Sequence, residues 1–409
     1  MKVMQINCVY GKGSTGKIVM DLHNVLVEIG IESVVCYGRG QKPEGNGVYK
    51  TCSEPYSKLN NLLSRISGIM YGGCLISTAK LIRIIKRERP DIVHLHCING
   101  YFVNIYRLIK WLKRNHIKTV LTLHAEFMYT GSCGYALDCN CWRESGCVSC
   151  PRWKSETGSW FFNRTRRAWK KMRDAFSGFD NNLAVVSVSP WLCERAEQSA
   201  ILRDKRHRVV LNGLDDSVFR YKDAQEERKL LSLDDGKVIF HATPYFDLSE
   251  GNIKGGRHVV ELAHRLHGSN VKIVVAGDYD KAVELPDNMI MLGRVSDQKK
   301  LASLYSIADI TLLTSERETF SMVVAESLTC GTPVVGFEAG APETIAIDDY
   351  CVFVKYADAD ALAAAVTDFL YERKFDKSEI SRMASEKYSK RIMSDAYIKI
   401  YSELTGDTQ

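Results

Sequence analysis

Two glutamates eight residues apart offer the clearest chemistry in this sequence of 409 residues. Glu318 and Glu326 follow an apolar run at 310–314, which predicts a buried strand, and they precede Gly331, which is typical of a helix end. If that helix begins near Phe320, Glu318 lies just before it and Glu326 about two turns inside it. Carboxylates placed there can accept hydrogen bonds from vicinal hydroxyls, one pair from a sugar and one from a ribose. An amphipathic helix with a charged outer face would give the same spacing.

The expected start of this helix is suited to binding an anion. The backbone N–H groups of Phe320 and Ser321 would point out of the N-terminus with the helix dipole behind them, as a diphosphate requires. Lys254, followed by Gly255 and Gly256 at the expected start of another helix, offers a cation. No Asp-x-Asp pair is placed to hold a catalytic metal, so we predict none.

A glycine-rich loop follows the first predicted strand. Residues 11–17 spell G-x4-G-K, but Ile18 stands where a P-loop needs Ser or Thr to coordinate Mg²⁺. We therefore predict that the loop is not an ATPase site.

His124 follows a predicted strand at 119–123, at a carboxyl end where ligand-binding residues of parallel sheets belong. A single histidine there is also commonly a packing residue.

Five of the thirteen cysteines lie between positions 133 and 150, within a loop rich in turn residues. The spacing Cys147-x2-Cys150 lets two thiolates reach one ion, and four ligands close a tetrahedral structural zinc site. We predict that the ligands are Cys133, Cys139, Cys147 and Cys150, with Cys141 too near Cys139 for an ordinary chelate. The alternatives are thiols that merely pack, or a redox-labile disulfide.

The elements that must position these residues alternate between short apolar runs and longer helical patterns. This alternation predicts an α/β chain of two doubly wound, Rossmann-like domains, with ligands at the carboxyl ends of the strands and in the cleft between domains. We place the first domain at 1–205 with a Cys-rich insertion at 131–151, and the second at 206–385. A strand at 208–211 would open the second domain, and a final helix at 386–409 would pack back on the first.

The bulk composition excludes several classes of protein. Hydrophobic residues make up 45% and the net charge is +6, values of an ordinary globular chain. The start of the sequence reads as a strand and not as a secretory signal, and no apolar run is long enough to span a bilayer. We therefore expect a cytoplasmic protein with reduced thiols.

Residues 160–173 interleave aromatic and basic side chains, which predicts either peripheral contact with anionic lipid or an ordinary basic helix. No nucleic-acid-binding module is recognisable.

Several motifs together resemble family 4 glycosyltransferases. The stretch from Ser315 to Phe337 is similar to their E-x7-E signature. Asn212–Phe219 is similar to their N-G-[LIV]-D-x-x-x-F segment. Further similar markers are Asp91–His96, Leu123–His124, Ser187–Ser189 and Gly340–Glu343. The resemblance runs over nearly the whole chain and implies the GT-B fold, with two Rossmann-like domains facing a cleft.

The resemblance also implies roles for individual residues. Glu318 would meet the donor sugar and Glu326 the ribose, while Lys254 would neutralise the leaving diphosphate. His124 would lie beside the transferring sugar, and the loop with Gly13 and Ser14 near the donor phosphates.

The implied reaction is a retaining transfer of a hexose-type sugar from a nucleotide-diphospho-sugar. No catalytic metal would be needed, and the acceptor would be a glycan or a polyprenyl-linked lipid in cell-surface polysaccharide synthesis. A subset of such enzymes carries a similar cysteine-rich insertion after the cleft histidine. The plasma membrane's inner face is the location that this chemistry implies.

The sequence departs from the family pattern at two places. Ala125 stands where relatives often carry Asp, so a partner for His124 is not evident. Residues 243–250 lack the usual Arg, which leaves Arg257 or Arg294 as a second cation. A nucleotide-sugar epimerase of the same fold and a non-catalytic nucleotide-binding protein are the alternative functions. The sequence does not name the sugar, the base, the acceptor or the oligomeric state.

Overall fold

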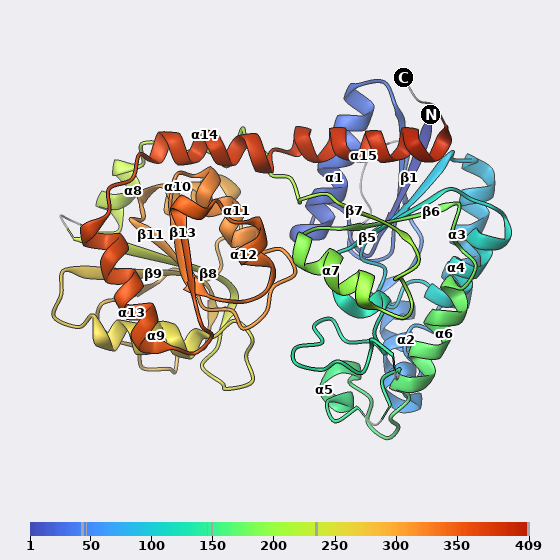
Figure 1. Cartoon of the computed structure of the whole chain (residues 1–409), viewed down its shortest axis with the longest axis horizontal. Helices are drawn as coiled ribbons and strands as arrows, with labels where there is room; N and C mark the ends of the chain where they lie inside the picture. Colours follow the sequence, from blue (N-terminus) through green and yellow to red (C-terminus); the bar gives the residue numbers. More distant parts are fainter. Residues whose placement is uncertain (42–44, 46, 145, 149, 234–235, 407–409) are drawn as a thin grey trace. The chain divides into compact units, whose positions relative to one another are not determined.

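The computed structural model describes residues 1–41, 45, 47–144, 146–148, 150–233 and 236–406. These residues form two compact units: residues 1–211 with 393–409, and residues 212–392 (Figure 1). Each unit contains one parallel β-sheet with helices around it, as the alternating pattern predicted. Among the helices described, none is long and apolar enough to cross a bilayer.

The first unit contains a seven-stranded sheet in the order β3-β2-β1-β4-β5-β6-β7. Its strands are β1 (Lys2–Asn7), β2 (Glu32–Tyr37), β3 (Val48–Lys50), β4 (Ile92–Leu95), β5 (Thr119–Leu123), β6 (Leu183–Ser187) and β7 (Arg206–Val209). Its helices are α1 (Gly13–Glu28), α2 (Glu54–Ser67), α3 (Leu75–Glu88), α4 (Ile105–Arg114), α5 (Trp153–Thr157), α6 (Thr165–Phe176) and α7 (Pro190–Gln198), with a 3₁₀ turn η1 (Glu126–Met128). Every residue of β5 is buried, because helices cover both faces of the sheet.

The second unit contains a six-stranded sheet in the order β10-β9-β8-β11-β12-β13. Its strands are β8 (Lys237–Phe246), β9 (Val271–Tyr279), β10 (Met289–Met291), β11 (Ile310–Leu313), β12 (Val334–Phe337) and β13 (Cys351–Val354). Its helices are α8 (Gln225–Leu230), α9 (Gly256–Arg265), α10 (Gln298–Ile307), α11 (Met322–Thr329), α12 (Ala341–Ile345), α13 (Ala359–Thr367) and α14 (Lys377–Tyr388), with short turns η2 (Asp348–Tyr350) and η3 (Asp368–Glu372).

The strand order reverses direction at one point in each sheet. In the second unit the chain continues from β8 to β9 on one side and later returns to β11 on the other. In the first unit the same change occurs between β1 and β4. Ligands of doubly wound sheets bind outside the carboxyl ends of the strands at such switch points. Lys254 follows β8 and Glu318 follows β11, so both lie after strands that flank a switch point.

The boundary between the units differs from the sequence expectation. The strand expected at 208–211 to open the second domain is β7, which runs parallel to β6 as the edge strand of the first sheet. The units consequently divide after Leu211, not after residue 205. The isolated apolar run did not reveal which sheet the strand would join.

The C-terminal helical stretch contains two helices. α14 ends at Tyr388, and α15 (Lys390–Thr405) begins after Ser389. α14 belongs to the second unit, whereas from Met393 onward α15 belongs to the first. There Tyr397 and Tyr401 are buried in the core with Val3, Ile18 and Leu22.

Candidate active site

Glu318 is held at the carboxyl ends of β11 and β12. Its N–H donates to Ala339 O at 2.9 Å, and its carbonyl accepts from Ala341 N at 3.3 Å. Glu343 fixes this loop, because its Oε1 accepts from the N–H groups of Ala339 (2.6 Å) and Gly340 (3.0 Å). The residues at 340–343 that resemble a family marker therefore form the support for Glu318.

An ion pair joins Glu318 to Lys254. Lys254 Nζ lies 2.6 Å from Glu318 Oε1, and Glu318 is only 8% exposed. The lysine backbone is fixed from both sides: its N–H donates to Asn252 Oδ1 at 2.7 Å, and its carbonyl accepts from Thr314 Oγ1 at 2.9 Å. The sequence analysis predicted both side chains, and the structure brings them together.

Gly255 allows the lysine loop to approach the end of β11. A Cβ atom at Gly255 would lie 2.2 Å from Thr314 O, and the residue has a φ of +67°. A larger residue would therefore clash with the backbone and adopt a strained conformation. The glycine sets the distance between Lys254 and Glu318.

Helix α11 begins at Met322, two residues later than predicted. Phe320 is buried. Ser321 has a φ of +77°, and the extended segment ends there. Its Oγ caps the helix by accepting a hydrogen bond from Val324 N at 3.4 Å. The amides of Phe320 and Ser321 thus precede the helix. Those of Met322 and Val323 form its first turn, where amides have no intrahelical acceptor.

Glu326 lies in the second turn of α11 and is half-buried. Its Oε2 accepts from the hydroxyl of Tyr305 at 3.0 Å. Tyr305 comes from α10 and is fully buried; burial and the neighbouring carboxylate hold its pKa well above the usual range. The phenol therefore stays a donor and orients the Glu326 carboxylate.

The cations proposed to replace the missing Arg lie at two places. Arg257 is in the first turn of α9 and is half-buried. Arg294 follows β10, lies 3.9 Å from Asp278 and has a side chain that is 74% exposed.

Three histidines stack at the strand ends of the first unit. His124 is half-buried, and its Nε2 lies 3.3 Å from Nδ1 of His96; the rings of His96 and His94 are 3.8 Å apart. His94 is hydrogen-bonded to Thr122 and Tyr401, both at 2.7 Å. Burial lowers the pKa of His124 to about 4 and holds those of His94 and His96 well below 6.5. All three are neutral at pH 7.

His96 was not among the predicted site residues. The available signal was the strand order: β4 and β5 are neighbours, so residues that follow them lie side by side. Ala125 cannot serve as an acidic partner of His124, and the structure shows the His96 imidazole as its neighbour instead.

The glycine-rich loop follows β1, and α1 begins at Gly13 with Lys12 as its N-cap residue. Gly13 and Ser14 are exposed, and Gly11 and Gly13 have φ values of 66° and 63°. The first helix therefore begins within the glycine-rich loop itself.

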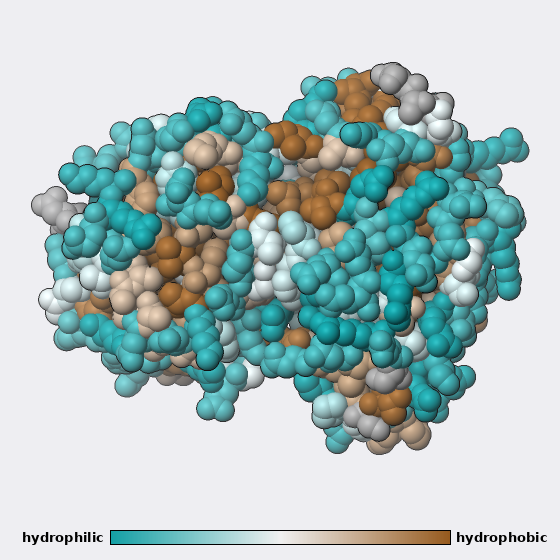
Figure 2. All heavy atoms as spheres, in the orientation of Figure 1, coloured by the Kyte–Doolittle hydropathy of each residue, from teal (hydrophilic) through white to brown (hydrophobic). Residues whose placement is uncertain are grey.

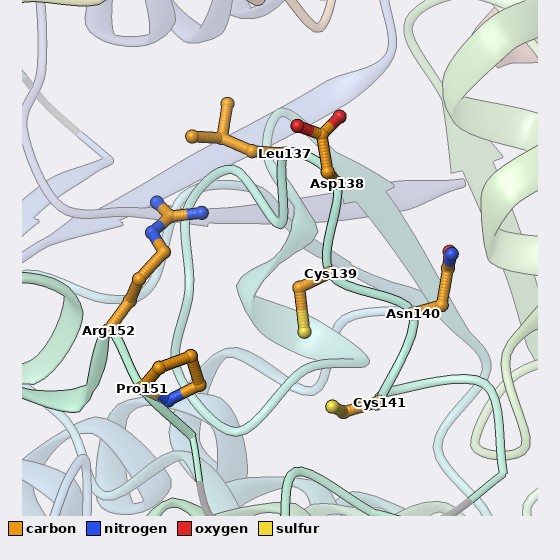
Figure 3. A pocket seen from close by; sticks show the side chains of 7 residues that line it. All are labelled: Leu137, Asp138, Cys139, Asn140, Cys141, Pro151 and Arg152. Atoms are coloured by element: carbon orange, nitrogen blue, oxygen red, sulfur yellow. The ribbon is translucent and has the colours of Figure 1, made fainter.

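The five cysteines of the insertion form no disulfide among the described residues. Cys139 and Cys141 line a cavity of about 640 Å³ with Asp138, Pro151 and Arg152, and their sulfurs point toward the same space (Figure 3). Cys147 Sγ accepts from Gly131 N at 3.1 Å, and burial raises its pKa to about 12. Among the residues with described positions, no three of these sulfurs lie within 4.8 Å of one another.

A buried ion pair ties the insertion to the rest of the first unit. Glu126 is fully buried and lies 2.6 Å from Arg195 of α7. Its other oxygen accepts from Ala136 N at 2.6 Å. Removing one partner of such a pair leaves a buried charge and is strongly destabilising. The insertion is therefore a packed part of the unit.

The segment 160–173 divides into two parts. Trp169 in α6 is buried, so residues 165–173 form an ordinary basic helix with its aromatic ring in the core. Trp160, Phe161 and Phe162 precede the helix and are 49%, 64% and 49% exposed. Only these three aromatic side chains are available for an external surface.

Two parallel-sheet α/β units, each with a switch point in its strand order, define a GT-B glycosyltransferase fold. Residues 15–218 match the family described as Glycosyltransferase Family 4, and residues 251–389 match Glycosyl transferases group 1. Together the two matches cover more than three quarters of the chain. The chain belongs to the family 4 glycosyltransferases, as the motifs predicted, and it is an enzyme of that class.

Individual relatives agree with this assignment. The Escherichia coli (strain K12) protein named as colanic acid biosynthesis glycosyl transferase WcaC is 21% identical, over 99% of this chain and 100% of its own length. Sucrose-phosphate synthase from Thermosynechococcus elongatus has the same fold, with a TM-score of 0.69 at 15% identity over the whole of both chains. Anabaena Alr3699/HepE, solved in complex with UDP-glucose, has a TM-score of 0.64 at 14% identity, covering 98% of this chain and 100% of its own.

Proposed function

We propose that this glycosyltransferase transfers a hexose-type sugar from a nucleotide-diphospho-sugar to a glycan or polyprenyl-linked acceptor, with retention of anomeric configuration, in cell-surface polysaccharide synthesis. The observation that carries the proposal is the Lys254–Glu318 ion pair, 2.6 Å long, near the start of α11. It gathers a cation and a sugar-binding carboxylate beside helix amides. Glu326, oriented by Tyr305, lies farther along the same helix.

The donor diphosphate would bind Lys254 and the first amides of α11, together with those of Phe320 and Ser321. An anion there competes with Glu318 for the lysine, so donor binding would release the carboxylate to accept hydrogen bonds from sugar hydroxyls. The ribose hydroxyls would donate to Glu326. Binding of the diphosphate would thereby make the Glu318 carboxylate available to bind the sugar.

Leaving-group departure concentrates negative charge on the diphosphate. A fixed cation and helix amides stabilise that charge more in the transition state than in the bound donor. We propose that they serve in place of a catalytic divalent metal. His124, neutral at pH 7, would act beside the sugar as a hydrogen-bonding group and not as a cation, and Gly13 and Ser14 would contact the donor phosphates.

The names of relatives support the proposed substrate class. WcaC is named for colanic acid biosynthesis, and HepE was solved with UDP-glucose. The first name describes sugar transfer for a polysaccharide, and the second structure contains a nucleotide-linked hexose. We propose this substrate class for the present chain because it resembles WcaC over its whole length and HepE in fold.

The proposal includes peripheral contact with the inner face of the plasma membrane. Helix α2 exposes Leu59, Leu62, Leu63 and Ile66, which share one face, while its polar Ser57, Asn60 and Ser64 are buried. The exposed aromatics adjoin this stripe, because Trp160 N donates to Arg65 O at 2.8 Å. In the view of Figure 2, a few hydrophobic side chains (brown) are exposed among hydrophilic ones (teal) at the lower end of this unit.

The charges around the apolar stripe favour an anionic bilayer. Lys58, Arg65, Arg166 and Arg167 are exposed on α2 and α6, and Arg164 lies 5.1 Å from the ring centre of Phe162. Basic side chains around exposed aromatics and leucines are typical of interfacial binding. A lipid-linked acceptor would be reached from such a position.

We further propose that the insertion binds a structural zinc ion through Cys133, Cys139, Cys147 and Cys150. The donor set fits zinc chemically, and the thiols lie on one packed insertion. Bound sulfurs would approach to about 3.8 Å of one another, so the loop would close around the ion. The metal would brace the loop and take no part in the reaction.

Donor turnover tests the proposed function. Purified protein is incubated with a panel of nucleotide-sugars, with and without polyprenyl-phosphate-linked glycan, and nucleoside-diphosphate release is measured. We expect release that requires acceptor and a product that keeps the anomeric configuration. Interconversion of donor sugars without acceptor would show an epimerase, and binding without turnover would contradict the proposal.

A further inference from the structure

We propose a zinc site, separate from the cysteine-rich insertion, formed by Cys193 and Glu197 of α7 and His207 of β7. One ligand atom from each lies within 4.8 Å of the others, the only such group among the residues that the structure describes. Cys193 and Glu197 are one helical turn apart and so share a face. The site therefore bridges a helix and the edge strand of the first sheet.

The state of His207 indicates a prepared metal ligand. Its Nε2 lies 2.8 Å from the carbonyl oxygen of Leu202, so the Nε2–H donates there and the Nδ1 lone pair is left bare. Nδ1 is buried and has no hydrogen-bond partner among the described residues. Histidines that bind metals usually donate their other N–H to a carbonyl in this way, which fixes the ring and its tautomer. An ion at Nδ1 would satisfy a buried group that is otherwise costly to leave unpaired.

The other two ligands have the spacing of a tetrahedral site. Cys193 Sγ lies 3.7 Å from Glu197 Oε1. Zinc–sulfur and zinc–oxygen bonds of about 2.3 and 2.0 Å, at a tetrahedral angle, separate the two atoms by about 3.5 Å. These two ligand atoms therefore already lie at nearly the separation that a shared zinc ion requires.

Charge also balances at the site. Cys193 is a buried thiol that lies beside the Glu197 carboxylate. Zinc would replace the thiol proton, which passes to solvent, and one thiolate with one carboxylate neutralises the ion. Glu197 is exposed, so a water can complete the fourth position.

The expected consequence is a clamp on the edge strand. β7 pairs with β6 on one side only, and an ion shared with α7 would hold its outer part in place. The proposal concerns the stability of the first unit and does not depend on the function proposed above.

Metal content and His207 spectroscopy test this site. Protein equilibrated with zinc and dialysed is analysed for metal in the wild type, Cys193→Ala, His207→Gln and the control Glu194→Gln, an exposed residue of the same helix. We expect Cys193→Ala and His207→Gln each to lose about one equivalent and part of the zinc-dependent rise in Tm, with the control unchanged. In a Cys193→Ala/Cys147→Ser double variant the losses should add.

A measurement on the wild-type protein remains informative if a variant folds poorly. In ¹⁵N-histidine-labelled protein, adding zinc should shift the His207 Nδ1 resonance, and a chelator should reverse the shift. An unchanged Nδ1 resonance at saturating zinc, or wild-type metal content in folded Cys193→Ala, would overturn the proposal.

Discussion

Lys254 and Glu318 neutralise one another in the structure described, and this has consequences for substitution of either residue. Because Glu318 is almost fully buried, loss of the lysine would leave its carboxylate without its cation. Because the lysine backbone is fixed by Asn252 and Thr314, a substituted side chain should leave the loop in place. The effects of Lys254 variants on turnover should therefore report mainly the loss of charge, and a Tm measured for each variant accounts for any effect on folding.

Lys254→Ala should lower kcat/KM by about 2–4 kcal/mol, the range for removal of one preorganised group that stabilises developing charge. Lys254→Arg should recover part of the loss, and Lys281→Ala, at an exposed lysine of the same unit, should have no effect. Steady-state kinetics of nucleoside-diphosphate release would measure this. A Lys254→Ala enzyme within threefold of wild type would show that another cation stabilises the leaving group.

At the residue scale the sequence indicated candidate side chains but not the contacts that surround them. The spacing and motif identified Glu318, Glu326 and Lys254, but nothing in the sequence placed the lysine and Glu318 in contact. That contact depends on Gly255 approaching the end of β11, a tertiary feature. His96 was missed because its neighbour, His124, is distant in sequence and adjacent only through strand order.

At the scale of elements, helix α2 reverses the usual pattern of a surface helix. Leu59, Leu62, Leu63 and Ile66 lie outward at i, i+3, i+4 and i+7, and small polar side chains lie inward. Such a face normally contacts another surface. Periodicity alone would have assigned these leucines to the core.

Binding to vesicles should depend on this stripe. A Leu63→Ser/Phe161→Ser variant should bind vesicles containing phosphatidylglycerol at least tenfold more weakly, because two exposed apolar side chains together contribute roughly 2 kcal/mol or more on insertion. Leu230→Ser, at a 78% exposed leucine of the second unit, is the matched control. Sedimentation with anionic and neutral vesicles measures the effect; equal binding by the double variant and the control would contradict the membrane role.

The cysteine-rich insertion is the element for which we propose a structural zinc ion. Cys147→Ser should remove about one zinc per chain and lower the Tm, because a four-ligand structural site fails when one thiolate is lost. Cys141→Ser, at the spare thiol, should keep both. Elemental analysis with thermal unfolding measures this, and equal zinc and Tm in the two variants would show that the four chosen thiols do not bind the ion.

Element boundaries were predicted less well than element types. The helix after β11 begins at Met322 because Ser321 adopts a positive φ and caps it, which composition does not reveal. β7 joined the first sheet because its pairing partner is β6, a long-range contact. The C-terminal stretch, expected to be one helix, is two helices separated at Ser389. The first belongs to the second unit, and most of the second belongs to the first unit.

At the scale of the whole molecule, three histidines with lowered pKa values make stability depend on pH. The pKa of His124 is about 4 and those of His94 and His96 are also well below 6.5, so on unfolding each histidine takes up a proton as the pH falls below 6.5. The unfolded chain then binds more protons, and stability is full above pH 6.5 and lost below it.

Between pH 7 and pH 5.5 the first unit should lose about 1 kcal/mol per buried histidine. Tryptophan fluorescence isolates this unit, because all six tryptophans lie between positions 111 and 191. Urea unfolding at the two pH values measures the loss, and His96→Gln should show a smaller pH dependence than wild type. Stability that stays constant over this range would contradict the neutral state of the three rings.

The family assignment rests on matches to both units, whereas the proposed ribose site lies within the second unit. Binding of a nucleoside diphosphate tests that location without an acceptor or a known sugar. Glu326 is the most informative position, since we propose that it binds the ribose, and Tyr305 donates a hydrogen bond to its carboxylate.

Isothermal titration calorimetry with UDP, GDP, ADP and dTDP is therefore the most direct measurement. The wild type should bind at least one of them. Glu326→Ala should bind that nucleotide about 10–100-fold more weakly, because hydrogen bonds to a charged group contribute about 1.5–3 kcal/mol. Glu372→Ala, at an exposed glutamate of the same unit, should bind like the wild type. Equal affinity of Glu326→Ala and wild type, or no binding of any of the four nucleotides, would contradict the assignment of the donor site.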